Sequence, residues 1–183
     1  KCLRFFPLAG NIRLANGGTK SKKADINLVG IPHSVFKANN LMGDVIFRSV
    51  FGIEAGNLVA KHNADRLAGA VLQHACIEKQ VEYNEALAPR PGTKCLILGV
   101  ETGGRMGKDL LDLLSYCALT KTNRTLGILP ENPDPQVKIE HNSLAARTKH
   151  HMIAKIQTAR VKQIARRILQ ITCPYTARAG VAA

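Results

Sequence analysis

The segment Lys94-Cys-Leu-Ile-Leu-Gly-Val-Glu-Thr-Gly-Gly-Arg105 joins an apolar run to a carboxylate and then to two consecutive glycines. Its apolar part predicts a buried strand, because short apolar runs bounded by turn residues are typical of strands inside a sheet. Glu101 stands where this strand ends, and a helix is predicted after the glycine turn, from Met106 onward. An acid in that position is held by the sheet while the loop leaves it accessible, so the segment indicates a candidate site.

The composition indicates a folded, basic protein. The 183 residues, of which 45% are hydrophobic, are enough for a domain with its own core and argue against a disordered chain. The net charge of +13 indicates a polyanionic partner, most often nucleic acid. The alternatives are a basic protein without such a partner, or a mitochondrial protein.

The five cysteines are widely spread and form no Cys-x-x-Cys pair. This favours a reducing, intracellular compartment and argues against a structural zinc site. No apolar run approaches the roughly 20 residues of a membrane span, so no membrane partner is expected. The chain begins at Lys1 rather than Met, which indicates a processed protein or a piece of a longer one.

Hydrophobic patterning predicts an α/β protein with two parts. An α/β domain is expected over residues 1–130, and an extended connector with a basic C-terminal helix over 131–183. Glycines in the fifties predict a linker, and three prolines predict an extended connection over 121–141. The expected strands cover 24–31, 43–51 and 95–101, and the expected helices cover 65–87, 106–120 and 143–172.

The C-terminal helix is expected to be strongly basic, because no acid follows Glu140. A basic amphipathic helix can lie on nucleic acid, on a membrane surface or on a partner protein, and the overall charge favours nucleic acid. Three lysines in the first loop form a second basic cluster, which could equally be a solvated loop. The candidate nucleic-acid-binding residues are Lys20, Lys22, Lys23, Arg105, Arg147, Lys155, Arg160, Lys162, Arg166 and Arg167.

Three acids, Asp25, Asp44 and Glu101, stand at the ends of predicted strands, and Lys79 lies on the helix between the second and third strands. If the strands are neighbours, these groups can converge. Carboxylate oxygens bind Mg²⁺, which polarises a phosphodiester and activates water, while a lysine offsets developing negative charge. The set is the minimum for a metal-dependent nuclease. Alternatively, these acids cap turns or pair with basic neighbours.

Four motifs follow one another in an order that resembles a known family. They are Lys22-Lys23-Ala24-Asp25-Ile26, Gly43-Asp44-Val45-Ile46, Glu78-Lys79-x-x-x-Tyr83 and Leu98-Gly-Val-Glu101-Thr-Gly-Gly-Arg105-Met-Gly. This order is similar to the restriction-enzyme-like endonuclease domain at the C-terminus of non-LTR retrotransposon (reverse transcriptase) proteins. The similarity covers roughly residues 13 to 170, and the glycine-rich fourth motif is its most specific part.

The resemblance implies a restriction-endonuclease-like central mixed sheet flanked by helices. It implies that Asp25 and Asp44 bind the metal, that Lys79 is the catalytic lysine, that Tyr83 lines the same site and that Glu101 supports it. Such enzymes nick DNA to expose a 3′ hydroxyl that primes reverse transcription. The chain departs from the family in having alanine where proline precedes the first acid, and a long gap between the two aspartates.

Two functions are therefore expected. The first is a Mg²⁺-dependent DNA-nicking endonuclease derived from a retrotransposon, which would act in the nucleus. The alternative is a catalytically inactive, domesticated domain that serves as an RNA-binding structural component of a large ribonucleoprotein, such as a mitochondrial ribosome. Its other partners would then be proteins of that complex.

Overall fold

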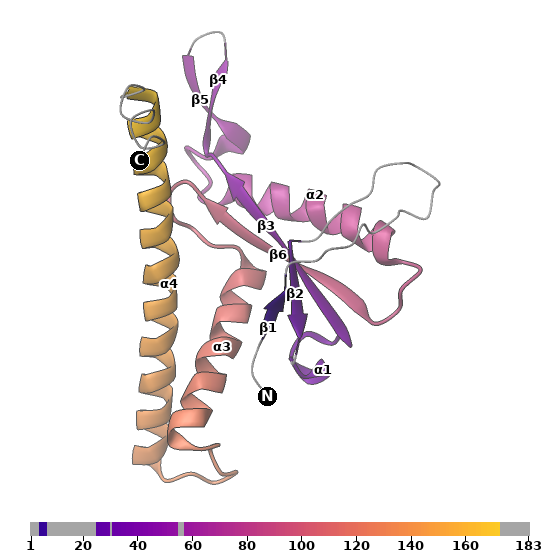
Figure 1. The fold of residues 1–183 in the computed structure, drawn as a ribbon, viewed down its shortest axis with the longest axis vertical. Coiled ribbons are helices and arrows are strands. Elements are labelled where there is room, and N and C mark those ends of the chain that lie inside the picture. The colour runs from indigo at the N-terminus through magenta and orange to yellow at the C-terminus, as the bar shows by residue number, and fades with distance from the viewer. Residues whose placement is uncertain (1–3, 7–24, 30, 55–56, 173–183) are drawn as a thin grey trace, which may run out of the picture. The chain divides into compact units, whose positions relative to one another are not determined.

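The computed structural model describes residues 4–6, 25–29, 31–54 and 57–172. The chain divides into two compact units, Lys1–Leu113 and Leu114–Ala183. Figure 1 shows strands and helices in the first unit and helices in the second. The boundary expected at residue 130 falls in the loop between α3 (Lys108–Leu126) and α4 (Pro135–Thr172).

A four-stranded mixed sheet forms the centre of the first unit. Its strands are ordered β1 (Arg4–Phe6), β2 (Ile26–Val29), β3 (Asn40–Arg48) and β6 (Thr93–Glu101). The first three pair antiparallel, whereas β3 and β6 pair parallel along their whole length. The mixed sheet and its helices confirm the expected α/β class.

Helix α2 (Ala70–Leu87) connects the two parallel strands and buries one side against them. The shared core is mostly aliphatic, as the composition predicts, and its members come from β3, α2 and β6. The closest approach is at Gly99, where an added Cβ would lie only 2.5 Å from Leu72 Cδ1. The core residues are Met42, Ile46, Leu72, Ala75, Tyr83, Ala86, Leu87, Cys95 and Ile97.

The outer edge of β6 is covered by the turn that leads into α3. The amide of Ile97 donates a hydrogen bond to Asp109 Oδ2 at 2.9 Å. Gly107 N donates to the carbonyl of Gly99 at 2.8 Å. The start of α3 is therefore fixed along the last strand of the sheet, and it ends that strand where the sequence predicts a turn.

Several elements in the first unit differ from the sequence prediction. Strands β4 (Phe51–Glu54) and β5 (Asn57–Ala60) form an antiparallel pair where a linker is predicted. Helix α2 begins at Ala70 rather than near residue 65, because the chain first makes a short 3₁₀ helix, η1 (Lys61–Asn63), and turns through Gly69 at φ 89°. A one-turn helix, α1 (His33–Phe36), occupies part of a predicted loop.

The second unit contains α4 and the part of α3 from Leu114 onward. The predicted connector over 121–141 is wrong, because both helices extend into it. Helix α4 begins eight residues early, with Asp134 Oδ1 accepting a hydrogen bond from Gln136 N at 2.8 Å and Pro135 in the first turn. No helix in the described ranges is long and apolar enough to cross a membrane.

Candidate functional site

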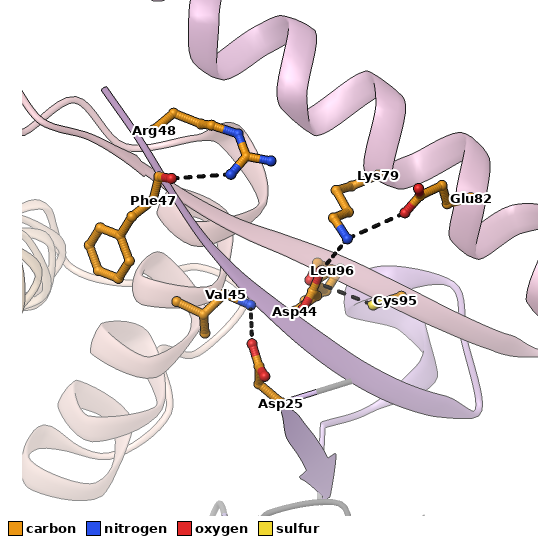
Figure 2. A network of polar contacts seen from close by, with 9 residues as sticks. All are labelled: Asp25, Asp44, Val45, Phe47, Arg48, Lys79, Glu82, Cys95 and Leu96. Carbon is orange, nitrogen blue, oxygen red and sulfur yellow. Dashed lines mark hydrogen bonds and ion pairs between the residues drawn. The ribbon is translucent and has the colours of Figure 1, made fainter. Parts of the chain in front are cut away.

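The first unit brings together four of the predicted site residues, Asp25, Asp44, Lys79 and Tyr83. The antiparallel register pairs Ile26 with Gly43, which puts Asp25 opposite Asp44. Figure 2 shows Lys79 reaching from α2 toward Asp44 on β3, with Asp25 at the start of β2 beside the same strand. These residues come from three elements, so the fold rather than local sequence assembles them.

Lys79 joins the helix to the aspartate. Its Nζ lies 3.8 Å from Asp44 Oδ2 and 3.3 Å from Glu82 Oε2. Asp44 is only 8% exposed, which makes its pairing matter more than a surface ion pair would. Glu82 is a site residue that the sequence analysis missed. Its position three residues after Lys79 on a helix is the signal that could have found it.

Tyr83 lies one turn after Lys79, is 2% exposed and shares a hydrogen bond with Asp44. Burial, and after it the charge of Asp44, raises the pKa of the Tyr83 hydroxyl, so this group stays protonated at neutral pH. A protonated phenol donates its hydrogen bond to the carboxylate. Tyr83 therefore orients the Asp44 side chain from the core side.

The electrostatics of Asp44 reflect a crowded acidic site. Burial raises the pKa of Asp44, and the adjacent Asp25 raises it further through its charge and a side-chain hydrogen bond. Lys79 and the Tyr83 hydrogen bond act in the opposite direction without cancelling the rise. Asp44 is therefore easier to protonate than a free aspartate, and a divalent cation bound at this place would relieve the repulsion between the carboxylates.

Asp25 is held by the backbone of the neighbouring strand. Its Oδ2 accepts a hydrogen bond from Val45 N at 2.8 Å, which fixes the carboxylate beside Asp44. The described residues contain no group of three or more His, Cys, Asp or Glu side chains that could hold a metal ion. Two carboxylates nevertheless fit Mg²⁺, which is commonly bound by one or two carboxylates together with substrate phosphates and waters.

Glu101 does not join this acid pair. It pairs in register with Arg48, four residues beyond Asp44, which separates the two acids by about 13 Å along the strands. Glu101 Oε1 instead accepts a hydrogen bond from Leu72 N at 3.1 Å, and Oε2 lies 3.6 Å from Arg105 Nε. Glu101 therefore anchors the first turn of α2. Neither of these two contacts involves the acid pair, so the expected support of the metal site by Glu101 stays a prediction.

The predicted basic residues are spread over both units. Arg105 is half exposed and pairs with Glu101. On α4, Arg147, Lys155 and Lys162 are exposed and Arg160 is half-buried. Arg166 and Arg167 belong to α4, but their side chains lie outside the described part of the structure, as do Lys20, Lys22 and Lys23 entirely.

A hollow of about 520 Å³ in the first unit is separate from the acid pair. It lies between α2 and the turn before α3, and its apolar lining includes Leu72, Ile77 and Met106. None of the four assembled site residues lines it. This hollow and the acid pair are therefore separate features, and the juxtaposed acids and lysine are the candidate site.

Comparison with known proteins adds no relative. No protein-family model matches the chain, and no curated protein or solved structure matches it significantly. The function is therefore argued from the site itself.

Proposed function

We propose that this protein is a Mg²⁺-dependent endonuclease that nicks DNA at the site formed by Asp25, Asp44 and Lys79. The observation that carries the proposal is the 3.8 Å contact between Lys79 Nζ and Asp44 Oδ2, beside a second aspartate fixed opposite Asp44. Acids and a lysine from three separate elements meet at one place. Metal-assisted hydrolysis of a phosphodiester can use such an arrangement, which supports the proposal.

The two aspartates would hold Mg²⁺, which polarises the scissile phosphate and lowers the pKa of bound water when it is present. Lys79 offsets the negative charge that develops on the phosphate oxygens. Tyr83 keeps Asp44 oriented through its hydrogen bond. The oxygen of the attacking water bonds to phosphorus and gives up a proton to solvent. The bond from phosphorus to O3′ breaks, and O3′ takes up a proton from solvent, which leaves a 3′ hydroxyl and a 5′ phosphate.

The proposal includes a restriction-endonuclease-like fold. It is supported by the mixed sheet, by the helix that connects the parallel strands β3 and β6, and by a lysine on that helix facing the acid of β3. It is also supported by the motif order that resembles the endonuclease domain of non-LTR retrotransposon proteins. The 3′ hydroxyl would then serve as a primer in the nucleus.

A second candidate function is an inactive domain that binds RNA as a component of a ribonucleoprotein, such as a mitochondrial ribosome. The long basic helix α4 favours it, because its cations lie in a unit that contains none of the acid pair. This function needs binding without cleavage. It makes Asp25 and Asp44 structural residues that pair with Lys79 and the β3 backbone.

A nicking assay on supercoiled plasmid distinguishes the two functions. We expect Mg²⁺-dependent conversion to the open circular form, and a rate at least about a hundredfold lower for Asp44→Asn, since metal-assisted stabilisation is worth several kcal/mol. Asp65→Asn is the matched control, because Asp65 is an exposed acid of the same unit away from the pair. Equal rates for wild type and Asp44→Asn, or no nicking by the wild type, would contradict the nuclease.

A further inference from the structure

The second unit carries two adjoining hollows along one side of α4. The first is about 280 Å³ and the second about 410 Å³. They share His151 and Lys155, so together they form one continuous depression, here named the α3–α4 groove. The first hollow is lined by Lys121, Arg147, Thr148, His151, Met152 and Lys155. The second is lined by His151, Ala154, Lys155, Thr158, Ala159 and Lys162.

The polar residues of the groove lie in a row. Arg147, His151 and Lys155 follow at steps of four residues, and Lys162 comes seven residues later, which keeps all four on one side of the helix. The row is about 22 Å long at 1.5 Å per residue. Lys121 enters the same groove from α3, so cations approach it from two helices.

The cations of the groove carry uncompensated charge. No acidic residue lines either hollow. Among the described residues, Lys121, Lys155 and Lys162 have no ion-pair partner, and Arg147 donates a hydrogen bond to the hydroxyl of Ser143 at 3.2 Å. By contrast, Arg105 and Lys108 of the first unit each pair with an acid. The groove is therefore a positively charged surface that can bind an external anion.

We propose that the α3–α4 groove binds the phosphate backbone of a single nucleic-acid strand. The cations Arg147, Lys155 and Lys162 are seven or eight residues apart, about 10–12 Å along the helix, so each can contact a different phosphate of one extended strand. Thr148 and Thr158 supply hydroxyl donors between the cations. The lining lacks the broad Leu, Phe or Trp face that a membrane-surface helix buries, so the observations favour nucleic acid over lipid.

This inference deepens the proposed function, on which it rests for the choice of nucleic acid as ligand. It assigns backbone binding to one side of α4 and to Lys121. Lys121 and His151 were not among the basic residues that the sequence singled out. Lys138 lies on the same helix, is exposed and lines neither hollow, so it is outside the groove.

The test measures the affinity of the whole chain for labelled single-stranded DNA and RNA 20-mers by fluorescence anisotropy, in EDTA so that nothing is cut. The triple variant Lys121→Gln/Arg147→Gln/Lys155→Gln should bind about a hundredfold more weakly at 0.1 M salt, with a salt slope reduced by about 2. Lys155→Gln should reduce the slope by about 0.7, and its matched control Lys138→Gln should leave it unchanged. Circular dichroism verifies that helix content is retained.

The outcomes separate this inference from the nuclease proposal. An unchanged slope in the triple variant overturns the groove as the binding surface, even if Asp44-dependent nicking is observed. A weakened triple variant in a protein that never nicks supports the groove and contradicts the nuclease. If the triple variant loses binding to anionic lipid vesicles or to a polyglutamate peptide but keeps its affinity for both 20-mers, the groove serves another partner and the inference fails.

Discussion

Lys79 and Asp44 face each other across the contact between α2 and β3, with the amine 3.8 Å from the carboxylate. Lys79 also lies 3.3 Å from Glu82, so it is shared between a buried acid and a half-buried one. The raised pKa of Asp44 shows that this single cation does not fully compensate burial and the nearby Asp25. An additional positive charge beside Asp44 and Asp25 would therefore be electrostatically favourable.

The raised pKa of Asp44 predicts a pH-dependent stability. The folded protein holds this proton at pH values where the unfolded chain has lost it, so the contribution of Asp44 to stability falls as pH rises from about 3.8 through the raised pKa. Asp44→Asn removes this loss. The free energy of unfolding in urea is measured for both proteins at pH 7 and at pH 3.5. The variant's value minus the wild-type value should be larger at pH 7 than at pH 3.5, and an equal difference at the two pH values would contradict the assignment.

Magnesium should stabilise the wild type through the same residue. A ligand that binds only the folded state at a hundred times its Kd adds about 2.7 kcal/mol. We expect Mg²⁺ to raise the melting temperature of the wild type and of Asp65→Asn in differential scanning fluorimetry, and EDTA to reverse the rise. Asp44→Asn should show a much smaller rise. A rise of the same size in Asp44→Asn would mean that Mg²⁺ binds elsewhere.

Glu101 should matter for stability and not for chemistry. Glu101→Ala removes the acceptor for Leu72 N in the buried first turn of α2, which should cost about 1–3 kcal/mol. Glu101→Gln retains an acceptor oxygen and should cost less. Nicking per folded molecule should be unchanged in both, measured below their melting temperatures. A selective loss of nicking in a stably folded Glu101→Gln protein would return Glu101 to the site.

Gly99 should tolerate no side chain. An alanine Cβ there would lie 2.5 Å from Leu72 Cδ1 and 3.2 Å from Cys76 Sγ, so these side chains or α2 must shift, at a cost of about 1–3 kcal/mol. Gly103→Ala is the matched control, because nothing lies within 4 Å of its added Cβ. Urea unfolding should show a lower free energy of unfolding for Gly99→Ala and no change for Gly103→Ala. Adding Leu72→Ala to Gly99→Ala should recover little of the lost stability, because the smaller side chain creates a cavity.

The sequence predicts the centre of the first unit well. Strands β2, β3 and β6 and the core of α2 follow apolar patterns that local residues determine. The start of α2 is different, because it depends on a hydrogen bond between Leu72 and Glu101, 29 residues apart. At α4, the prolines of 130–135 suggest an extended connector, although the Asp134-Pro135 pair is itself a helix-start signal.

The assembly of the site was predictable only in part, because some of its features depend on local sequence and others on contacts distant in sequence. Lys79 and Tyr83 lie one helical turn apart and Asp25 directly precedes β2, as the sequence predicts, whereas Asp44 lies in the middle of β3 and not at the strand end that was predicted. The position of Glu101 is not readable from local sequence, because it depends on the nine-residue parallel register between β3 and β6. A pattern of acids after strands does not reveal which acids share an edge of the sheet.

The covered edge of β6 has a consequence for how copies of this protein behave at high local concentration. Exposed strand edges recruit strands from other molecules and seed aggregation. Here Asp109 occupies the amide of Ile97, and Gly107 occupies the carbonyl of Gly99. Molecules at high local concentration would therefore meet a strand edge that cannot pair with another strand over this stretch.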